Sequence, residues 1–194
     1  MTNRDLEVAE LIEKAAQSNA ETLDLTFKRL TSLPTEIKKL KNHLKFLDLR
    51  NNKLKTLPPE IGELQSLNAL FLTTNELEEL PPEIGNLSTL QRLNLTENHL
   101  TRLPQEFGNL RGLTELYLAN NQLQSLPNEF GNLIELERLS LTNNKLEQLP
   151  LKFGQLEKLI WLDLNSNNLH NLTSAIKGLK QLSKLNISYN KLTG

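Results

Sequence analysis

One spacing dominates this chain, because a segment of 23 residues returns along most of its length. Residues 113–135 nearly overlay themselves when they are shifted by that spacing in either direction. The clearest markers of the period are glycines and asparagines, at Gly62, Gly85, Gly108, Gly131 and Gly154 and at Asn52, Asn75, Asn98, Asn121, Asn144, Asn167 and Asn190. A fixed period in this range is typical of a solenoid, in which each unit buries its apolar face against its neighbours. The spacing therefore predicts one elongated domain.

The periodic part divides into seven complete turns and a partial eighth. The first turn has 24 residues and the others have 23, and they begin at Ala20, Leu44, Leu67, Leu90, Leu113, Leu136, Leu159 and Leu182. We assign residues 20–194 to the solenoid and residues 1–19 to a cap. Residues 3–17 read as an amphipathic helix that covers the open apolar edge of the first turn. Its polar face is mainly acidic, which disfavours the alternative of a membrane anchor on anionic lipid.

Each turn has a strand half and a returning half. In Leu116-Tyr117-Leu118 the two leucines alternate with an outward residue, the period-2 pattern of a strand with one buried face. Strands of neighbouring turns would stack in parallel. Residues 126–133 begin at a proline corner and are too short for a stable α-helix, so a 3₁₀ turn is expected on the outer side. The asparagine after each strand can satisfy backbone groups of adjacent turns inside the core.

The shared pattern Leu-x-x-Leu-x-Leu-x-x-Asn-x-Leu, followed by Leu-Pro, an Ile or Phe, a Gly and a Leu, resembles the leucine-rich repeat family. The resemblance covers about 170 of the 194 residues. Its 23-residue units with Leu-Pro-x-Glu-Ile-Gly-Asn-Leu are similar to the intracellular repeats of Ras-associated scaffolds and to many bacterial repeat proteins. The resemblance implies an α/β solenoid, a right-handed horseshoe or arc with a parallel sheet on its concave face and extended or 3₁₀ segments on its convex face. It also implies a scaffold that binds proteins in signalling.

Composition excludes several classes of function. The chain carries 22 basic and 23 acidic residues, a net charge of −1, so it lacks the basic excess of proteins that bind nucleic acid or anionic lipid. It has no cysteine, and therefore no disulfide and no thiolate chemistry. No apolar run is long enough to span a membrane, and the first residues lack the apolar core of a signal peptide. We expect a cytoplasmic protein.

No constellation of residues predicts an enzyme. The three histidines occupy different phases of the repeat and should not converge, at His43, His99 and His170. Phosphate-binding glycine motifs are absent. A column of glutamates, Glu36, Glu60, Glu83, Glu106 and Glu129, is expected on the convex side as a solvated face rather than a cation site. We expect no catalytic residues, no cofactor and no metal.

The residues that differ most between turns are those at the outward-pointing positions of the strands. Six of the nine aromatic residues fall there, and exposed aromatics on a rigid surface are enriched in protein interfaces. We predict a protein-binding site on the concave face made of Phe46, Asp48, Phe71, Arg92, Glu115, Tyr117, Arg138, Trp161, Asp163 and Tyr189. Arg92, Glu115 and Arg138 are neighbours in one row, which allows them to pair as an ionic ladder beside Tyr117. The alternative is that these aromatics reflect strand propensity and pack only against one another.

Three hypotheses of function follow. The first is a non-enzymatic module that binds a protein partner on the concave face. The second is the recognition segment of a larger signalling enzyme such as a Roco-type GTPase, and the third is a secreted protein that binds host or cell-wall ligands. Nucleic acid is disfavoured because acidic residues interrupt the aromatics. The last turn degenerates, so its apolar end is tolerated, covered by protein beyond this chain, or covered by another copy through homo-association.

Overall fold

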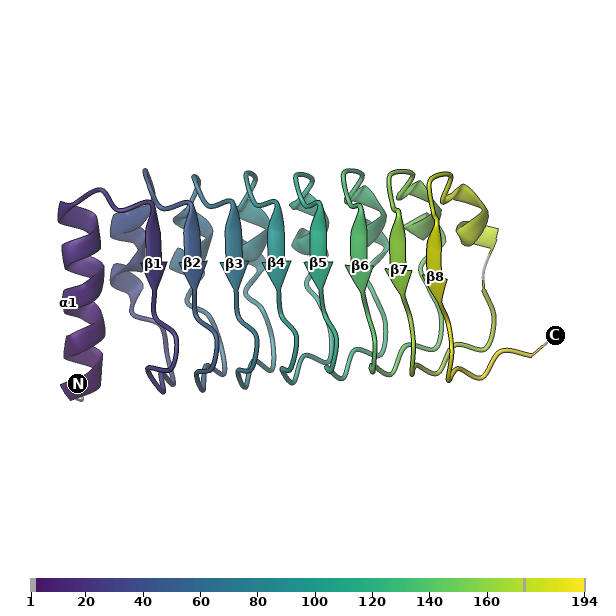
Figure 1. The fold of residues 1–194 in the computed structure, drawn as a ribbon, viewed down its shortest axis with the longest axis horizontal. Helices are drawn as coiled ribbons and strands as arrows, with labels where there is room; N and C mark the ends of the chain where they lie inside the picture. The colour runs from purple at the N-terminus through teal and green to yellow at the C-terminus, as the bar shows by residue number, and fades with distance from the viewer. Residues whose placement is uncertain (1–2, 173, 194) are drawn as a thin grey trace.

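A computed structural model describes residues 3–172 and 174–193. The chain forms one helix, α1 (Asn3–Gln17), followed by eight three-residue strands that make a single parallel sheet in sequence order. The strands are β1 (Thr22–Asp24), β2 (Phe46–Asp48), β3 (Ala69–Phe71), β4 (Arg92–Asn94), β5 (Glu115–Tyr117), β6 (Arg138–Ser140), β7 (Trp161–Asp163) and β8 (Lys184–Asn186). Figure 1 shows the two termini at opposite ends of the stack. The expected α/β solenoid with a parallel sheet is confirmed.

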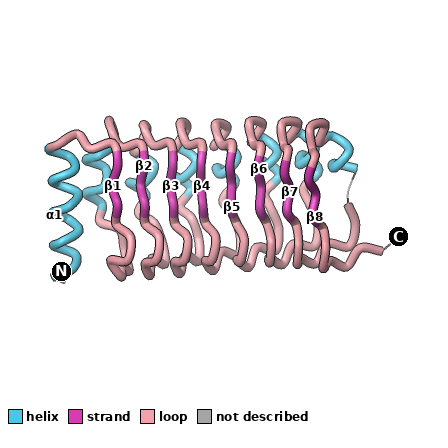
Figure 2. The backbone as a smooth tube through the Cα atoms, viewed as in Figure 1, coloured by secondary structure: helices cyan, strands magenta, loops and turns pink. Residues whose placement is uncertain are grey.

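A 3₁₀ helix follows each of the strands β1 to β7 on the back of the sheet, so these seven turns have two layers (Figure 2). These helices span Thr35–Leu40, Pro59–Glu63, Pro82–Asn86, Gln105–Asn109, Asn128–Asn132, Leu151–Gln155 and Ser174–Gly178. Most begin directly after a proline in extended conformation, such as Pro127 at φ −64° and ψ 152°. The fixed φ of proline sets the corner, and five residues suffice for a 3₁₀ turn but not for an α-helix.

The core is a ladder of leucines enclosed between the two layers. In the middle turns the inward leucines of the strands are fully buried, as at Leu116 and Leu118. Phe107, Phe130 and Phe153 are also fully buried, and their rings stack in register with centroids 6.2 and 6.1 Å apart. Side chains at one phase thus meet their own equivalents in the next turn, which is why the period is strict.

Helix α1 closes the first edge of this core. Val8 and Ile12 are fully buried against the first turn, and each buried side chain of this size contributes about 1.5–3 kcal/mol. Two ion pairs fasten the exposed side of the helix, Lys28 to Glu7 at 2.7 Å and Lys39 to Glu13 at 2.5 Å. The predicted capping helix has the predicted bounds. Lys28, which replaces asparagine in the first turn, is one of the residues that hold it.

The asparagine column satisfies backbone groups of two successive turns. The Asn121 Nδ2 group donates to the Leu95 carbonyl of the preceding turn at 2.9 Å and to the Leu118 carbonyl of its own turn at 3.1 Å. Its Oδ1 accepts the Leu100 N–H at 3.0 Å. The same three bonds recur from Asn52 to Asn190. The predicted role of this column is confirmed.

A left-handed residue follows each strand, a feature that the sequence analysis did not predict. It has φ between 53° and 57° at Phe27, Asn51, Thr74, Glu97, Asn120, Asn143, Ser166 and Tyr189. Asparagine tolerates this region well, whereas a β-branched or bulky side chain there is strained. Thr74, Phe27 and Tyr189 therefore hold a conformation that their side chains do not favour, and the turn geometry imposes it on them.

Candidate functional site

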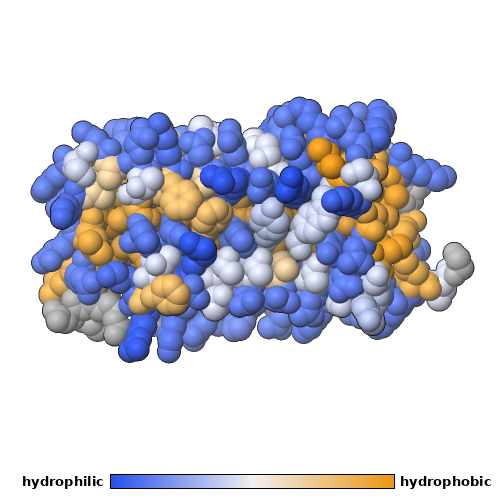
Figure 3. Space-filling model, in the orientation of Figure 1, coloured by the Kyte–Doolittle hydropathy of each residue, from blue (hydrophilic) through white to orange (hydrophobic). Residues whose placement is uncertain are grey.

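The sheet face that points away from the 3₁₀ helices carries the predicted site. Strand register aligns the rows as expected, with Arg92 opposite Glu115, Glu115 opposite Arg138 and Arg138 opposite Trp161. Nine of the ten predicted residues lie on β2 to β7, and Tyr189 follows β8. Figure 3 shows this face, where apolar surface gathers toward the α1 side and at the β8 end, with polar groups between.

The first half of the face is an aromatic cluster with arginines over it. The rings of Phe46 and Phe71 meet edge to face with centroids 5.1 Å apart. The guanidinium carbons of Arg50 and Arg92 lie 5.7 and 5.9 Å from the Phe71 ring centroid, within the range of cation–π attraction. Both cations keep one ring in place, so Phe71 is a fixed, half-buried platform rather than a loose side chain.

Asp48 lies on this face but is only 4% exposed. Arg50 binds its carboxylate through two nitrogens, Nε at 2.9 Å from Oδ1 and Nη2 at 2.6 Å from Oδ2. These hydrogen bonds, and then the carboxylate charge, raise the pKa of Arg50. The Asp48 side chain is thus occupied inside the protein. Arg50, which the sequence analysis left out of the site, is the more accessible member of the pair.

The second half of the face contains a pocket of about 270 Å³. Its lining comes from the four successive strands β5 to β8 and the residues that precede β7 and β8: Tyr117, Arg138, Ile160, Trp161, Ser183 and Lys184. Tyr117 and Trp161 are half-buried and offer ring surface, while Arg138 and Lys184 are exposed cations. Ile160, Ser183 and Lys184 were not predicted. Ile160 and Ser183 directly precede β7 and β8, so they fall outside the outward strand positions from which the site was predicted. Lys184 occupies one of those outward positions but was not included in the predicted site.

Tyr117 is held at the edge of this pocket by its hydroxyl, which donates to the Glu115 carboxylate at 3.2 Å. Burial of the ring, and then the charge of Glu115, raise the pKa of Tyr117, while Arg138 acts in the opposite direction. The tyrosine therefore stays neutral under ordinary conditions and remains a hydrogen-bond donor. Arg138 lies close enough to influence the hydroxyl, which places a cation, a phenol and an indole around one cavity.

The ionic ladder that Arg92, Glu115 and Arg138 could form is not present among the described residues. The three residues are neighbours in register, yet within residues 3–172 and 174–193 neither arginine forms an ion pair within 4.0 Å. Arg92 lies over the Phe71 ring, and Glu115 accepts from Tyr117. Aromatic neighbours therefore outcompete the expected charge pairing, and both guanidiniums keep hydrogen-bonding capacity for a ligand.

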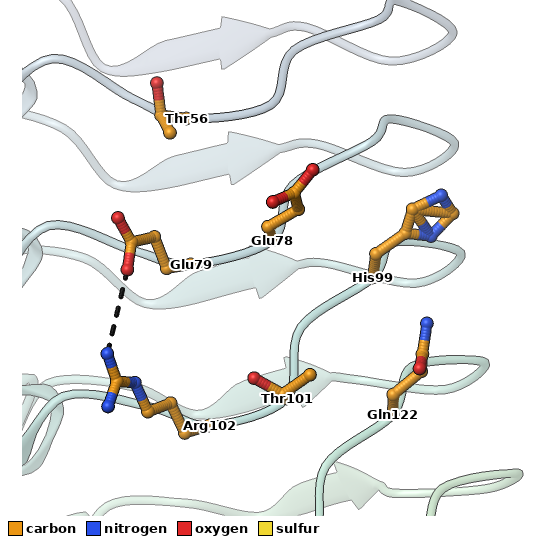
Figure 4. A pocket seen from close by; sticks show the side chains of 7 residues that line it. All are labelled: Thr56, Glu78, Glu79, His99, Thr101, Arg102 and Gln122. Atoms are coloured by element: carbon orange, nitrogen blue, oxygen red, sulfur yellow. Dashed lines mark ion pairs between the residues drawn. The ribbon is translucent and has the colours of Figure 1, made fainter.

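A second depression of about 650 Å³ lies along the flank where the chain leaves the strands. Figure 4 shows its seven lining residues on successive turns, namely Thr56, Glu78, Glu79, His99, Thr101, Arg102 and Gln122. All seven are exposed, and Arg102 and Glu79 form only a long ion pair of 3.9 Å. Such fully solvated groups lack the burial and the fixed partners that activate acids and bases. The depression is a polar groove between turns.

The histidines do not meet: His99 lines this groove, His43 lies before β2 and His170 lies far along the chain. In the described part of the chain, no group of three His, Cys, Asp or Glu side chains could hold a metal ion. The helices described there include none with the length and apolar character needed to cross a membrane.

Comparisons with known proteins agree with this architecture. Three family profiles match, described as "Leucine-rich repeat region" over residues 70–144, "Leucine rich repeat" over residues 134–192 and "Leucine Rich Repeat" over residues 43–64. A search of curated proteins gave no significant match. The profiles cover the turns in which the leucine and asparagine columns are complete.

Solved structures show the same solenoid. A leucine-rich repeat protein of Leptospira interrogans is 41% identical, with a TM-score of 0.79 over 93% of this chain and 52% of its own. The plant peptide hormone receptor RGFR1, solved in complex with RGF2, is 30% identical with a TM-score of 0.78, over 88% of this chain and 28% of its own. An ectodomain of an Arabidopsis thaliana receptor kinase, GASSHO1/SCHENGEN3, is 38% identical with a TM-score of 0.74, over 82% of this chain and 20% of its own. The chain thus spans about half the length of the Leptospira protein and less of the plant receptors.

Proposed function

The chain belongs to the leucine-rich repeat family, and from this we propose that it is a non-enzymatic module that binds a protein partner on its concave sheet face. The observation that supports the proposal best is the half-buried pair Tyr117 and Trp161 around an open pocket. Aromatic side chains beside cations in a water-accessible hollow are typical anchors of protein interfaces. The rigid parallel sheet holds them in place before a partner arrives, which lowers the entropy cost of binding.

Two of the similar structures support a peptide or protein as ligand. The plant receptors were solved with RGF2 and with CASPARIAN STRIP INTEGRITY FACTOR 2 bound, and the first is described as a peptide hormone receptor. We infer that the present chain uses the same kind of scaffold for a ligand of the same class. Localisation in the cytoplasm and a role in signalling belong to this proposal as well. Eight strands span about 34 Å, enough for a standard interface.

The double substitution Tyr117→Ala and Trp161→Ala tests the proposal. We expect it to abolish capture of the partner from a lysate of the source organism, because both anchors are removed from one pocket. The melting temperature should stay close to that of the wild type, since neither ring belongs to the leucine core. A large loss of stability with partner capture unchanged would instead support the alternative, in which the aromatics serve only to pack the sheet.

We also propose that copies of the chain associate through the β8 end. Leu185 on β8 is 41% exposed, whereas its equivalent Leu162 on β7 is fully buried, and Leu192 is 38% exposed. Such an apolar end favours contact with another apolar surface. Sedimentation at rising protein concentration should show a dimer, and Leu185→Lys should return it to a monomer. A monomer at all concentrations would contradict this second proposal without affecting the first.

A further inference from the structure

One row of the concave face alternates between cations and other side chains. It runs across the starts of five neighbouring strands as Arg92, Glu115, Arg138, Trp161 and Lys184. Cations thus occupy every second strand. Parallel strands lie about 4.8 Å apart, so successive cations of the row are spaced by about 9.6 Å.

These three cations differ from three lysines that lie on other parts of the solenoid. Lys45, Lys158 and Lys180 each bind a glutamate of the preceding turn at 2.6, 2.5 and 2.9 Å. Arg92, Arg138 and Lys184 have no such ion pair among the residues that the structure describes. Among the described residues, the row thus presents three cations without an ion pair, unlike these three lysines.

Acidic groups near the row are few: Glu115 lies within it, and the exposed Glu137 directly precedes Arg138. Glu115 is the only carboxylate within the row between Arg92 and Lys184, and it accepts the hydrogen bond of Tyr117. Asp163 lies at the other end of its strand, where its carboxylate accepts the Asn165 N–H at 2.9 Å. Glu97 follows β4 on the same far side and accepts the Thr74 hydroxyl. At the strand starts the three cations of the row outnumber Glu115 and Glu137, whereas Asp163 and Glu97 lie at or beyond the strand ends.

Aromatic rings fill the spaces beside the cations. Phe71 lies under Arg92, and Tyr117 and Trp161 line the 270 Å³ pocket together with Arg138 and Lys184. Aromatic-lined grooves are the usual docking surface for proline-rich segments, whose polyproline II conformation is already formed before binding. A polyproline II helix advances about 3.1 Å per residue, or about 9.3 Å for three residues. That repeat matches the spacing of the cations, whereas an extended β-strand repeats its side chains every 6.6–6.8 Å or so.

We propose that this row binds an acidic, proline-rich segment of the partner in polyproline II conformation, with a carboxylate at every third residue. The carboxylates face Arg92, Arg138 and Lys184, and the proline rings between them lie on Trp161 and Tyr117. The segment crosses the strands and passes Glu115, which contacts it only at the gap between two carboxylates. This inference rests on the proposed function and specifies the chemical class of the partner.

The single tryptophan of the chain makes the test direct, because its fluorescence reports on the pocket alone. A peptide of three Glu-Pro-Pro triplets, titrated at low ionic strength, should give a saturable change in Trp161 fluorescence that rising salt removes. Arg138→Gln and Lys184→Gln should each weaken the affinity about fivefold, since each removes one charge contact. Lys158→Gln is the matched control, because Lys158 is paired with Glu135 away from the row, and its affinity should be unchanged.

Two further peptides make the outcome decisive. One has the same composition with its glutamates grouped at one end, and the other has Lys-Pro-Pro triplets. Equal binding of either peptide, absence of a saturable signal, or an unchanged affinity in Arg138→Gln would overturn the inference. If the Tyr117/Trp161 double variant loses its natural partner while the Glu-Pro-Pro peptide fails to bind, the proposed function stands and only this assignment of the partner falls.

Discussion

Asn121→Ala is expected to lower the free energy of unfolding by about 3–5 kcal/mol, a large loss for a single polar side chain. The substitution leaves the Leu100 N–H and the Leu95 and Leu118 carbonyls without their partner. Each unpaired buried group costs about 1–3 kcal/mol, and Asn121 is only 7% exposed, so water cannot easily take its place. Urea denaturation of the intact chain measures the loss.

Asn190→Ala is the matched control, because Asn190 makes the same three bonds in the last turn. Its amide binds the Leu164 and Ile187 carbonyls at 2.9 Å, and its Oδ1 accepts the Leu169 N–H at 3.0 Å. Asn190 is half-exposed, so water can replace the lost bonds and the expected loss is about 1 kcal/mol. Equal losses for the two variants would show that the column does not act through buried hydrogen bonds.

The features that could be predicted from the sequence are those that every turn repeats. The strand triplets and the asparagine column follow from a period in which each side chain meets its own equivalent, whereas the bounds of α1 follow from its amphipathic pattern. For Phe130 the neighbours are Phe107 and Phe153, so one pattern determines both the residue and its surroundings. Where the contacts are periodic, the sequence carries the three-dimensional information directly.

The contacts within the site were harder to predict, because the residues at these positions differ from turn to turn and follow no repeating pattern. Asp48 was expected as an acidic contact for the partner, but Arg50, two residues further along the chain and just beyond the end of β2, binds its carboxylate. Arg92 could pair with Glu115 on the next strand, but its guanidinium lies instead over the ring of Phe71 on the preceding strand. These choices depend on side-chain rotamers and on several competing neighbours of similar strength. The sequence identifies this face as the surface whose residues differ between turns, but it does not predict which of its side chains contact one another.

The need for glycine at one position of successive turns is also explained only by the three-dimensional structure. A side chain at Gly108 would place Cβ 2.3 Å from the carbonyl oxygen of Glu129 and 2.6 Å from its Cβ. The same close approach occurs at Gly62 and Gly85, toward the glutamates of the following turns. The glycines thus let successive 3₁₀ helices lie backbone against backbone. Because the convex side is kept narrow, its spacing stays close to that of the strands in front.

Gly108→Ala is therefore expected to cost about 3 kcal/mol and to push the backs of two turns apart. Alanine is otherwise the better residue in a helical turn, so any loss must come from the contact with Glu129. Urea denaturation measures the stability. The Trp161 fluorescence titration measures whether the wider back disturbs the concave face, and we expect weaker peptide binding in this variant.

Gly112→Ala provides the comparison within the same turn. Its Cβ would lie 3.2 Å from the Ser88 carbonyl oxygen and 3.3 Å from that of Leu90, so a shift of a few tenths of an ångström accommodates it. We expect a change within about 1 kcal/mol, with the reduced freedom of the unfolded chain offsetting the contact. A loss at Gly108 no greater than that at Gly112 would contradict the view that close backbone packing sets the width of the convex side.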